Sequence, residues 1–134
     1  MSGLSRALVQ DSDAGATKPA RTGAGWLAAP SETVLADADS TITAAAIAGG
    51  LVTQVPTAAR TDTTDTAALI DAAMPNMDIG DTYMFMICAK AAFALTIAGG
   101  TGVTASGNLT VPASTGKFFM LVKTGAATFN LIGL

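Results

Sequence analysis

Residues 82–134 form a succession of short apolar runs, and this pattern constrains the fold more than any other feature of the sequence. Residues 82–88 and 118–123 are apolar on both alternating faces, whereas residues 93–97 carry large apolar side chains on one face. Residues 109–111 and 129–131 add two shorter runs, and Gly, Pro and Asn residues lie between the runs. Strands that recur about every 8–15 residues between such turns predict a mainly β domain, an antiparallel β-sandwich of jelly-roll-like form.

Residues 33–81 carry weaker strand signals. Residues 41–46 and 51–55 contain Thr, Val and Ile and are separated by Ala48-Gly49-Gly50. They predict a strand, a turn and a second strand that Pro56 closes. A further turn at Ile79-Gly80-Asp81 leads into the apolar runs.

One short amphipathic helix is predicted over residues 66–74. Thr64 or Asp65 can cap its first turn, and Pro75 ends it. Helical spacing places five residues on one face: Thr66, Leu69, Ile70, Ala73 and Met74. Asp71 is expected on the opposite, solvent-facing side.

Residues 1–32 differ in composition from residues 33–134, which we expect to form the β domain. The stretch between Asp11 and Gly25 mixes Gly, Ala, Thr, Lys, Pro and Arg and cannot bury enough surface to order itself. It is either a disordered terminus or an extended N-terminal arm that a partner orders. In the second interpretation, which the position of the only Trp favours, five apolar residues are the anchors: Leu4, Leu8, Val9, Trp26 and Leu27.

Several residue types that carry chemistry are absent or rare. The sequence has no His, the commonest general base and metal ligand, and a single Cys, Cys88, which excludes an intramolecular disulfide and Cys-based zinc clusters. Cys88 lies in an apolar run and is expected to be a buried, inert thiol. The seven Lys and Arg residues form no basic stripe, and no uncharged run is long enough to span a bilayer. We therefore expect no metal, no other cofactor, no nucleic-acid partner and no membrane partner.

Short matches to catalytic signatures do not meet the requirements of the chemistry. Residues 100–105 match the G-x-G-x-x-A pattern of dinucleotide-binding folds, but a predicted strand follows instead of a helix, and no acidic residue lies downstream. Residues 114–117 match S-x-x-K, which in serine enzymes lies at the start of a helix, whereas here a strand follows. We expect no catalytic residues and no enzymatic activity.

Charge is distributed unevenly along the chain. Asp81 is the last acidic residue, and residues 82–134 contain only Lys90, Lys117 and Lys123 as charged side chains. Monomeric β proteins usually protect their sheets with charges, so a region this poor in charge would aggregate if it were exposed. A strand that is apolar on both faces needs cover from a helix or a neighbouring subunit. We therefore expect much of this region to be covered by other copies of the chain in a closed oligomer.

Residues 41–134 resemble small β-domains on the virions of tailed double-stranded DNA bacteriophages, notably head decoration (cement) proteins. The resemblance rests on the segment Pro56-Thr57-Ala58-Ala59, the predicted helix at 66–74 with Pro75, Ile79-Gly80-Asp81 before residues 83–87, residues 95–97, 100–104 and 107–111, and the final strands with Phe118 and Phe129. It implies a jelly-roll-like β-sandwich, a homotrimer, and an N-terminal segment that reaches across the capsid lattice. It supplies no catalytic residues.

The sequence is thus interpreted as a non-enzymatic structural protein of the virion, which binds the major capsid protein on the outer surface of the capsid and stabilises the shell. An alternative is a tail-fibre or adhesin-type binding module that recognises a cell-surface glycan. Glycan recognition requires exposed aromatic side chains, for which Trp26 is the candidate.

Overall fold

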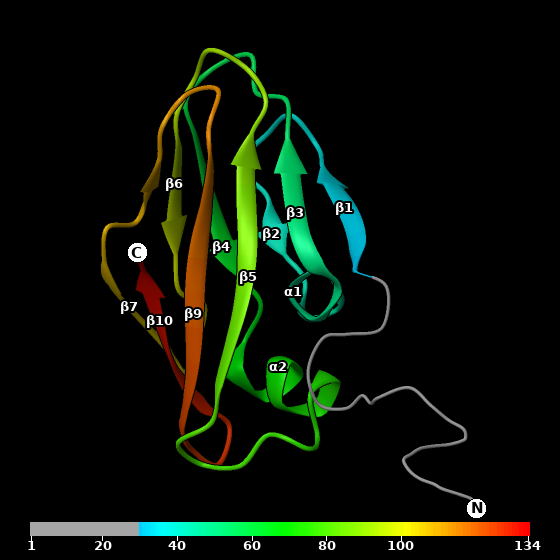
Figure 1. The fold of residues 1–134 in the computed structure, drawn as a ribbon, viewed down its shortest axis with the longest axis vertical. Coiled ribbons are helices and arrows are strands. Elements are labelled where there is room, and N and C mark those ends of the chain that lie inside the picture. The colour runs from blue at the N-terminus through cyan, green and yellow to red at the C-terminus, as the bar shows by residue number, and fades with distance from the viewer. Residues whose placement is uncertain (1–29) are drawn as a thin grey trace, which may run out of the picture. The chain divides into compact units, whose positions relative to one another are not determined.

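A computed structural model describes residues 30–134 of the chain (Figure 1). The predicted anchors Leu4, Leu8, Val9, Trp26 and Leu27 lie outside the described residues. Six strands form one sheet in the order β1 (Ser31–Leu35), β3 (Gly50–Gln54), β5 (Thr82–Ala89), β9 (Gly116–Gly125), β10 (Thr128–Gly133) and β7 (Val103–Gly107). Four strands form the other, in the order β2 (Thr41–Ile42), β4 (Arg60–Thr64), β6 (Leu95–Ala98) and β8 (Thr110–Val111).

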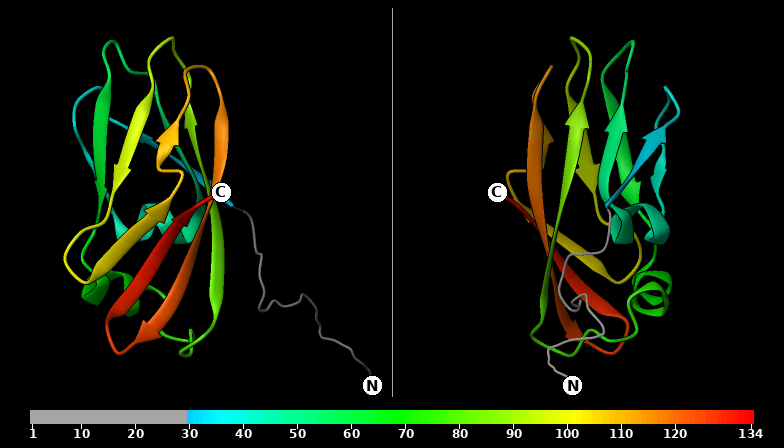
Figure 2. Two further views of the ribbon diagram at one scale, coloured as in Figure 1. Left: turned by 90° about the vertical axis from the view of Figure 1, so that its left-hand side faces the viewer. Right: turned by 45° about the vertical axis from the view of Figure 1, so that its right-hand side comes forward.

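The described chain passes from one sheet to the other between successive strands up to β9, and only β9 and β10 are consecutive in the same sheet. Figure 1 looks onto the six-stranded sheet with β2, β4 and β6 behind it, and Figure 2 gives side views. A mainly β fold is confirmed. Both sheets are mixed, however: antiparallel pairing holds for β5–β9, β9–β10 and β6–β8, and the other five pairs are parallel.

The parallel pairs follow from this crossing between sheets. The chain leaves β1, runs through β2 and helix α1 (Ala44–Gly49), and returns to the first sheet as β3 in the same direction as β1. The chain then passes through β4 and helix α2 (Ala67–Ala73) and returns to the first sheet as β5, which is parallel to β3. A connection of this kind carries the chain back to the starting end, so neighbouring strands align in parallel.

Helix α1 replaces most of the strand predicted over residues 41–46, and that prediction is wrong beyond Ile42. Thr43 caps the helix, because its Oγ1 accepts a hydrogen bond from Ala46 N at 3.1 Å. The Ala-rich sequence that follows has the highest intrinsic helix propensity. Gly50 ends the helix in the left-handed conformation, with φ at 89°, where the sequence indicated a turn between strands.

Helix α2 forms where it is predicted, and its buried face matches the predicted one in part: Ile70 is buried and Met74 packs against the core, but Ala67 is buried in place of Leu69. Its N-cap is Thr66, and the buried residues are Ala67 and Ile70, whereas Leu69 is exposed. Asp71 is half-buried and its Oδ1 lies 2.6 Å from Lys123 Nζ, so its predicted position on the solvent side is wrong. This ion pair connects the helix to β9.

Strand boundaries agree best where the sequence is most apolar. The runs at 82–88, 118–123 and 129–131 become β5, β9 and β10. Strand β1 begins at Ser31, inside the segment assigned to the N-terminal arm, and β6 begins at Leu95, so Phe93 precedes the strand and is exposed. Strands β4 and β7 were not predicted.

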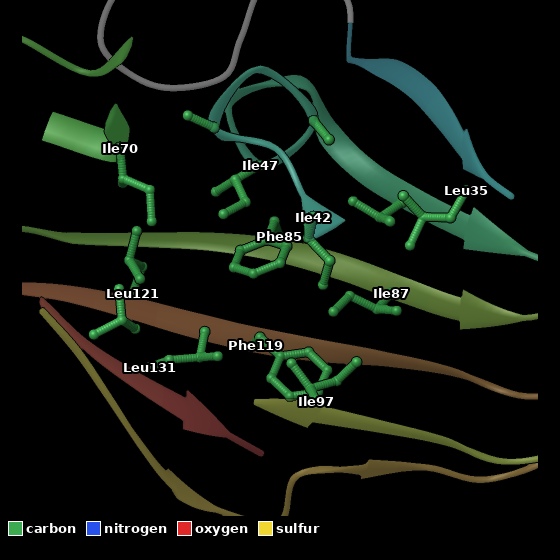
Figure 3. Packing of buried hydrophobic residues seen from close by; sticks show 14 of the residues in the cluster. Leu35, Ile42, Ile47, Ile70, Phe85, Ile87, Ile97, Phe119, Leu121 and Leu131 are labelled. Carbon is green, nitrogen blue, oxygen red and sulfur yellow. The ribbon is translucent and has the colours of Figure 1, made fainter. Parts of the chain in front are cut away.

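One hydrophobic cluster receives side chains from both sheets and both helices. Phe85, Phe119 and Leu131 extend from the six-stranded sheet, and Ile97 extends from the four-stranded sheet (Figure 3). The rings of Phe85 and Phe119 stack with their centroids 6.0 Å apart. Ile47 of α1 and Ile70 of α2 belong to the same cluster. Both helices therefore pack on the core side of the six-stranded sheet.

Candidate interaction surface

The side of the six-stranded sheet that faces away from the core is largely apolar over β3, β5, β9 and β10. We call it the outer face; it is the side toward the reader in Figure 1. Alternation along each strand defines its members, because the neighbouring residues on the same strands are buried in the core. Its apolar members are Val34, Leu51, Met84, Met86, Cys88, Phe118, Met120, Val122, Ile132 and Leu134, and uncharged polar residues (Thr82, Asn130, Thr104 and Ser106) lie at one end of the face and over β7.

The pairing register aligns these side chains in rows across the sheet. One row runs from Leu51 through Met86 to Phe118, and Leu134 N donates a hydrogen bond to Phe118 O at 3.4 Å, which brings Leu134 beside it. A second row runs from Met84 through Met120 to Ile132. Residues directly opposite each other on adjacent strands have Cβ atoms about 4.5–5.5 Å apart, so the rows form one continuous apolar surface.

Residues 30–134 do not cover this surface. Val34 is 63% exposed, Met84 49% and Phe118 48%, and the other large members are half-buried or, like Leu134, exposed. Large contiguous apolar patches on a folded domain mark sites of interaction. Three of the six Met residues of the chain lie here, and their flexible thioether side chains adapt to an opposing surface.

Charge is confined to one edge of the outer face. Lys90 Nζ lies 2.8 Å from Glu32 Oε2, which also accepts a hydrogen bond from Thr53 Oγ1 at 2.6 Å. The hydrogen bond from Lys90 lowers the pKa of Glu32 and raises the pKa of Lys90, and Thr53 lowers the pKa of Glu32 further. The outward positions of β5, β9 and β10 carry no charged residue. The edge pair is neutral overall, so the face as a whole has no net charge.

Cys88 lies on the outer face and not in the core. It is a free cysteine and is half-buried, which differs from the fully buried thiol that the sequence indicated. Its strand neighbour across the sheet is Gly116, and a Cβ atom built on that glycine would lie 3.7 Å from Cys88 Sγ. The nearest atom to that position is Met86 Sδ at 3.2 Å, so the Met86 side chain packs over Gly116 beside the thiol.

The other two lysines of residues 82–134 are held by contacts within the domain. Lys117 Nζ donates to the carbonyl oxygens of Asn108 and Thr110 and lies 5.4 Å from the centroid of the Phe119 ring. Lys123 Nζ contacts Asp71 Oδ1 and donates to Met77 O at 3.0 Å. The lysine of the S-x-x-K match thus lies on a strand, as predicted, and donates hydrogen bonds to two carbonyl groups of the same neighbouring segment.

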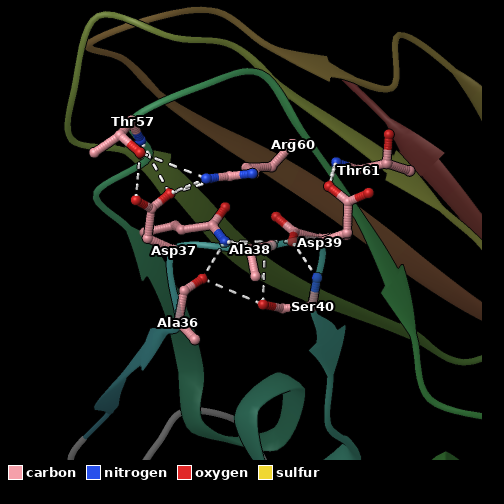
Figure 4. Close-up of polar contacts among 10 residues, drawn as sticks. Ala36, Asp37, Ala38, Asp39, Ser40, Thr57, Arg60 and Thr61 are labelled. Carbon is pink, nitrogen blue, oxygen red and sulfur yellow. Dashed lines mark hydrogen bonds and ion pairs between the residues drawn. The ribbon is translucent and has the colours of Figure 1, made fainter.

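A cluster of polar side chains holds the loop between β1 and β2 (Figure 4). Asp37 accepts hydrogen bonds from Thr57 N at 3.0 Å and Thr57 Oγ1 at 2.6 Å, and forms an ion pair with Arg60 at 2.8 Å. The Thr57 contacts, followed by the Arg60 hydrogen bond, lower the pKa of Asp37 to about 2. Asp39 Oδ1 accepts from Thr61 N at 2.9 Å. These contacts fasten the loop to the segment at residues 57–61 and leave the two carboxylates in structural roles.

Two buried side chains lie beneath this loop. Gln54 Nε2 donates to Ala36 O at 2.6 Å and Ala38 O at 2.9 Å, and Asp62 Oδ1 accepts from Ser40 N at 3.0 Å. Gln54 Oε1 and Asp62 Oδ2 are buried without a hydrogen-bond partner. Burial raises the pKa of Asp62, although its hydrogen bonds act in the opposite direction. Among the described residues, no group of three or more acidic or Cys side chains is arranged to hold a metal ion.

The residues that the sequence put forward for partner binding, the five arm anchors, are not among those that the structure describes. The outer face was indicated only in part, through the runs at 82–88 and 118–123 that are apolar on both sides. No helix within residues 30–134 is long and apolar enough to cross a membrane. Comparisons with protein-family models, with curated proteins and with solved structures find no match to this chain.

Proposed function

We propose that this chain is a non-enzymatic structural protein of a virion, a decoration (cement) protein that binds the outer surface of a tailed-phage capsid. The observation that carries the structural role is the outer face, an exposed and nearly uncharged sheet surface on a mainly β domain. Such a surface is typical of a protein that binds other proteins through an apolar interface. The assignment to a phage capsid is supported by the resemblance of residues 41–134 to head decoration proteins.

In this proposal the chain forms a homotrimer, and its partner is the major capsid protein. A jelly-roll-like β-sandwich is part of the same proposal. A protein that binds only the assembled shell stabilises that shell by mass action, which opposes the outward pressure of packaged DNA. Residues 1–32 would act as the arm that reaches across the lattice, with Leu4, Leu8, Val9, Trp26 and Leu27 as contacts.

Immunogold labelling of virions that carry the protein tests the placement directly. We expect gold particles distributed over the head, at many positions on each particle. Labelling restricted to the tail tip would contradict the decoration role and would favour the alternative, a module that binds a cell-surface glycan. Binding of the purified protein to capsids that lack it, followed by co-sedimentation, supplies the quantitative measurement.

A further inference from the structure

We infer that the outer face of the six-stranded sheet is the interface between copies of this chain. The inference rests on the proposed role as a self-assembling structural protein but does not depend on the capsid as partner. It assigns the contact to one surface, built on β3, β5, β9 and β10, and to one occupant, the same surface of another copy.

The chemistry of the face selects this occupant. Its central rows, Leu51–Met86–Phe118 and Met84–Met120–Ile132, offer no charge to pair with a nucleic acid or an anionic surface. The neighbouring ion pair between Glu32 and Lys90 is already neutral. An apolar surface without fixed charges is complementary to itself, because two copies related by symmetry bring no like charges together.

The size of the face limits how it can be used. The four strands β3, β5, β9 and β10, spaced about 4.8 Å apart and about 20 Å long, present roughly 400 Å² before side-chain relief is added. A standard protein–protein interface buries about 800 Å² on each partner. A twofold axis would pair whole faces, and a threefold axis would divide each face between two neighbours. In either arrangement most of the outer face has to be used, and Phe118 and Met84 lie near its centre.

The test compares lysine substitutions on the face with matched substitutions elsewhere. Phe118→Lys is paired with Phe93→Lys, because the two Phe side chains are 48% and 43% exposed and Phe93 lies outside the face. Met84→Lys is paired with Leu69→Lys on α2, at 49% and 52% exposure. Sedimentation equilibrium of the full chain should show an oligomer for the unmodified protein and for both controls. The two face variants should dissociate, with dissociation constants raised at least about 30-fold, the size typical of central interface residues.

Circular dichroism and thermal melting establish that each variant is folded. The unmodified protein supplies a second readout, because Cys88 lies on the face: its reaction with a thiol reagent should accelerate when dilution dissociates the oligomer. This measurement tests the inferred interface even if a lysine variant does not fold.

Any of three results from sedimentation and melting would overturn the inference: a monomer at micromolar concentration, folded face variants that remain assembled, or equal dissociation of the controls. A Cys88 reaction rate that is the same in the oligomer and in the dissociated protein would also overturn it. A dimer in place of a trimer would support the interface and contradict the proposed trimer. Loss of capsid binding without any change in oligomeric state would bear on the proposed function alone.

Discussion

Among single residues, the buried pair Gln54 and Asp62 has the least favourable environment. Gln54 Nε2 donates hydrogen bonds to two loop carbonyl groups. A flip of the side-chain amide would point Oε1 at those carbonyl groups, and both hydrogen bonds would be lost. The unpaired Gln54 Oε1 and Asp62 Oδ2 are both acceptors when Asp62 is ionised. A buried polar atom without a partner is costly, and the cost is greater for a charged group. The environment therefore favours the neutral acid, in keeping with the raised pKa of Asp62.

Asp62→Asn is expected to stabilise the domain at neutral pH, raising Tm by roughly 3 °C or more. Because the folded pKa of Asp62 is raised, its favourable contribution is fully present below the unfolded pKa and is lost as pH rises through the folded pKa. Asn cannot ionise, and its amide adds a donor next to Gln54. Thermal melting between pH 3 and pH 8 provides the measurement, and the advantage of the variant should shrink below about pH 4. A variant less stable than the parent at pH 7 would contradict this account.

Asp37 should show the opposite pH dependence. Its folded pKa of about 2 lies below the ordinary value of 3.8, so its contribution is present above that value and is lost as pH falls through about 2. Asp37→Ala should therefore lower Tm at pH 5 to 7 by a small amount, because the side chain is 35% exposed and solvent screens its ion pair. The difference from the parent should narrow as the pH approaches 2. Asp78→Ala, a substitution of an exposed Asp in another loop, is a suitable control.

At the scale of strands and helices, the sequence predicts best the elements that hydrophobic burial alone stabilises. Residues of β5 and β9 are apolar on both faces, and their boundaries were predicted to within about two residues. β4 was missed because its buried residues, Asp62 and Thr64, are polar and are held by hydrogen bonds, which a hydrophobic pattern does not report.

The same hydrophobic pattern does not predict which strands pair or in which direction. Alternation identifies a strand but does not say whether its neighbour is reached by a hairpin or through the opposite sheet. The connections that pass through the opposite sheet and through α1 or α2 make β1, β3 and β5 parallel. Recognising them requires that residues 44–49 be identified as a helix. The Thr and Ile residues around them favoured a strand instead.

The two faces of β5 should respond differently to truncation. Phe85→Ala removes a ring that is 1% exposed and stacked on Phe119, and should cost about 3–5 kcal/mol of the free energy of unfolding. This is a large part of the about 5–15 kcal/mol of a typical domain. Met84→Ala, one residue away on the outer face, should leave the fold intact and weaken assembly. Urea unfolding at a concentration below the assembly threshold separates the two effects, and equal losses for both variants would contradict the assignment of faces.

At the scale of the whole molecule, the sequence indicates only part of the candidate interaction surface. The surplus of apolar residues at 82–88 and 118–123 indicated a second covered side. Leu51 and Ile132 join the same surface only because β3 and β10 pair on either side of β5 and β9. Membership of the surface is therefore a property of the topology and cannot be assigned from strand periodicity.

In the proposed decoration role, deletion of residues 1–29 is expected to leave a folded, assembled protein that no longer binds capsids tightly. The described hydrophobic cluster begins at Leu35, and this deletion keeps β1 and the Glu32–Lys90 ion pair intact. The melting temperature should therefore be unchanged. Each apolar side chain buried on a partner contributes about 1.5–3 kcal/mol before ordering costs, and several arms on one oligomer multiply the effect. Capsid co-sedimentation should fall by orders of magnitude, with a smaller loss for Trp26→Ala. Undiminished binding would show that the capsid contact lies elsewhere.

The arrangement of rows across the outer face has a consequence for the order of events during synthesis. The row Met84–Met120–Ile132 draws on three strands, and Ile132 belongs to β10, which the ribosome makes after all the others. A nascent chain therefore cannot present the complete surface until nearly all of these residues have emerged and folded. Under the inferred interface, a chain that ends before β10 lacks Ile132 and should therefore assemble less well than a chain that contains β10. The topology thus makes assembly depend on the synthesis and folding of the last described strand.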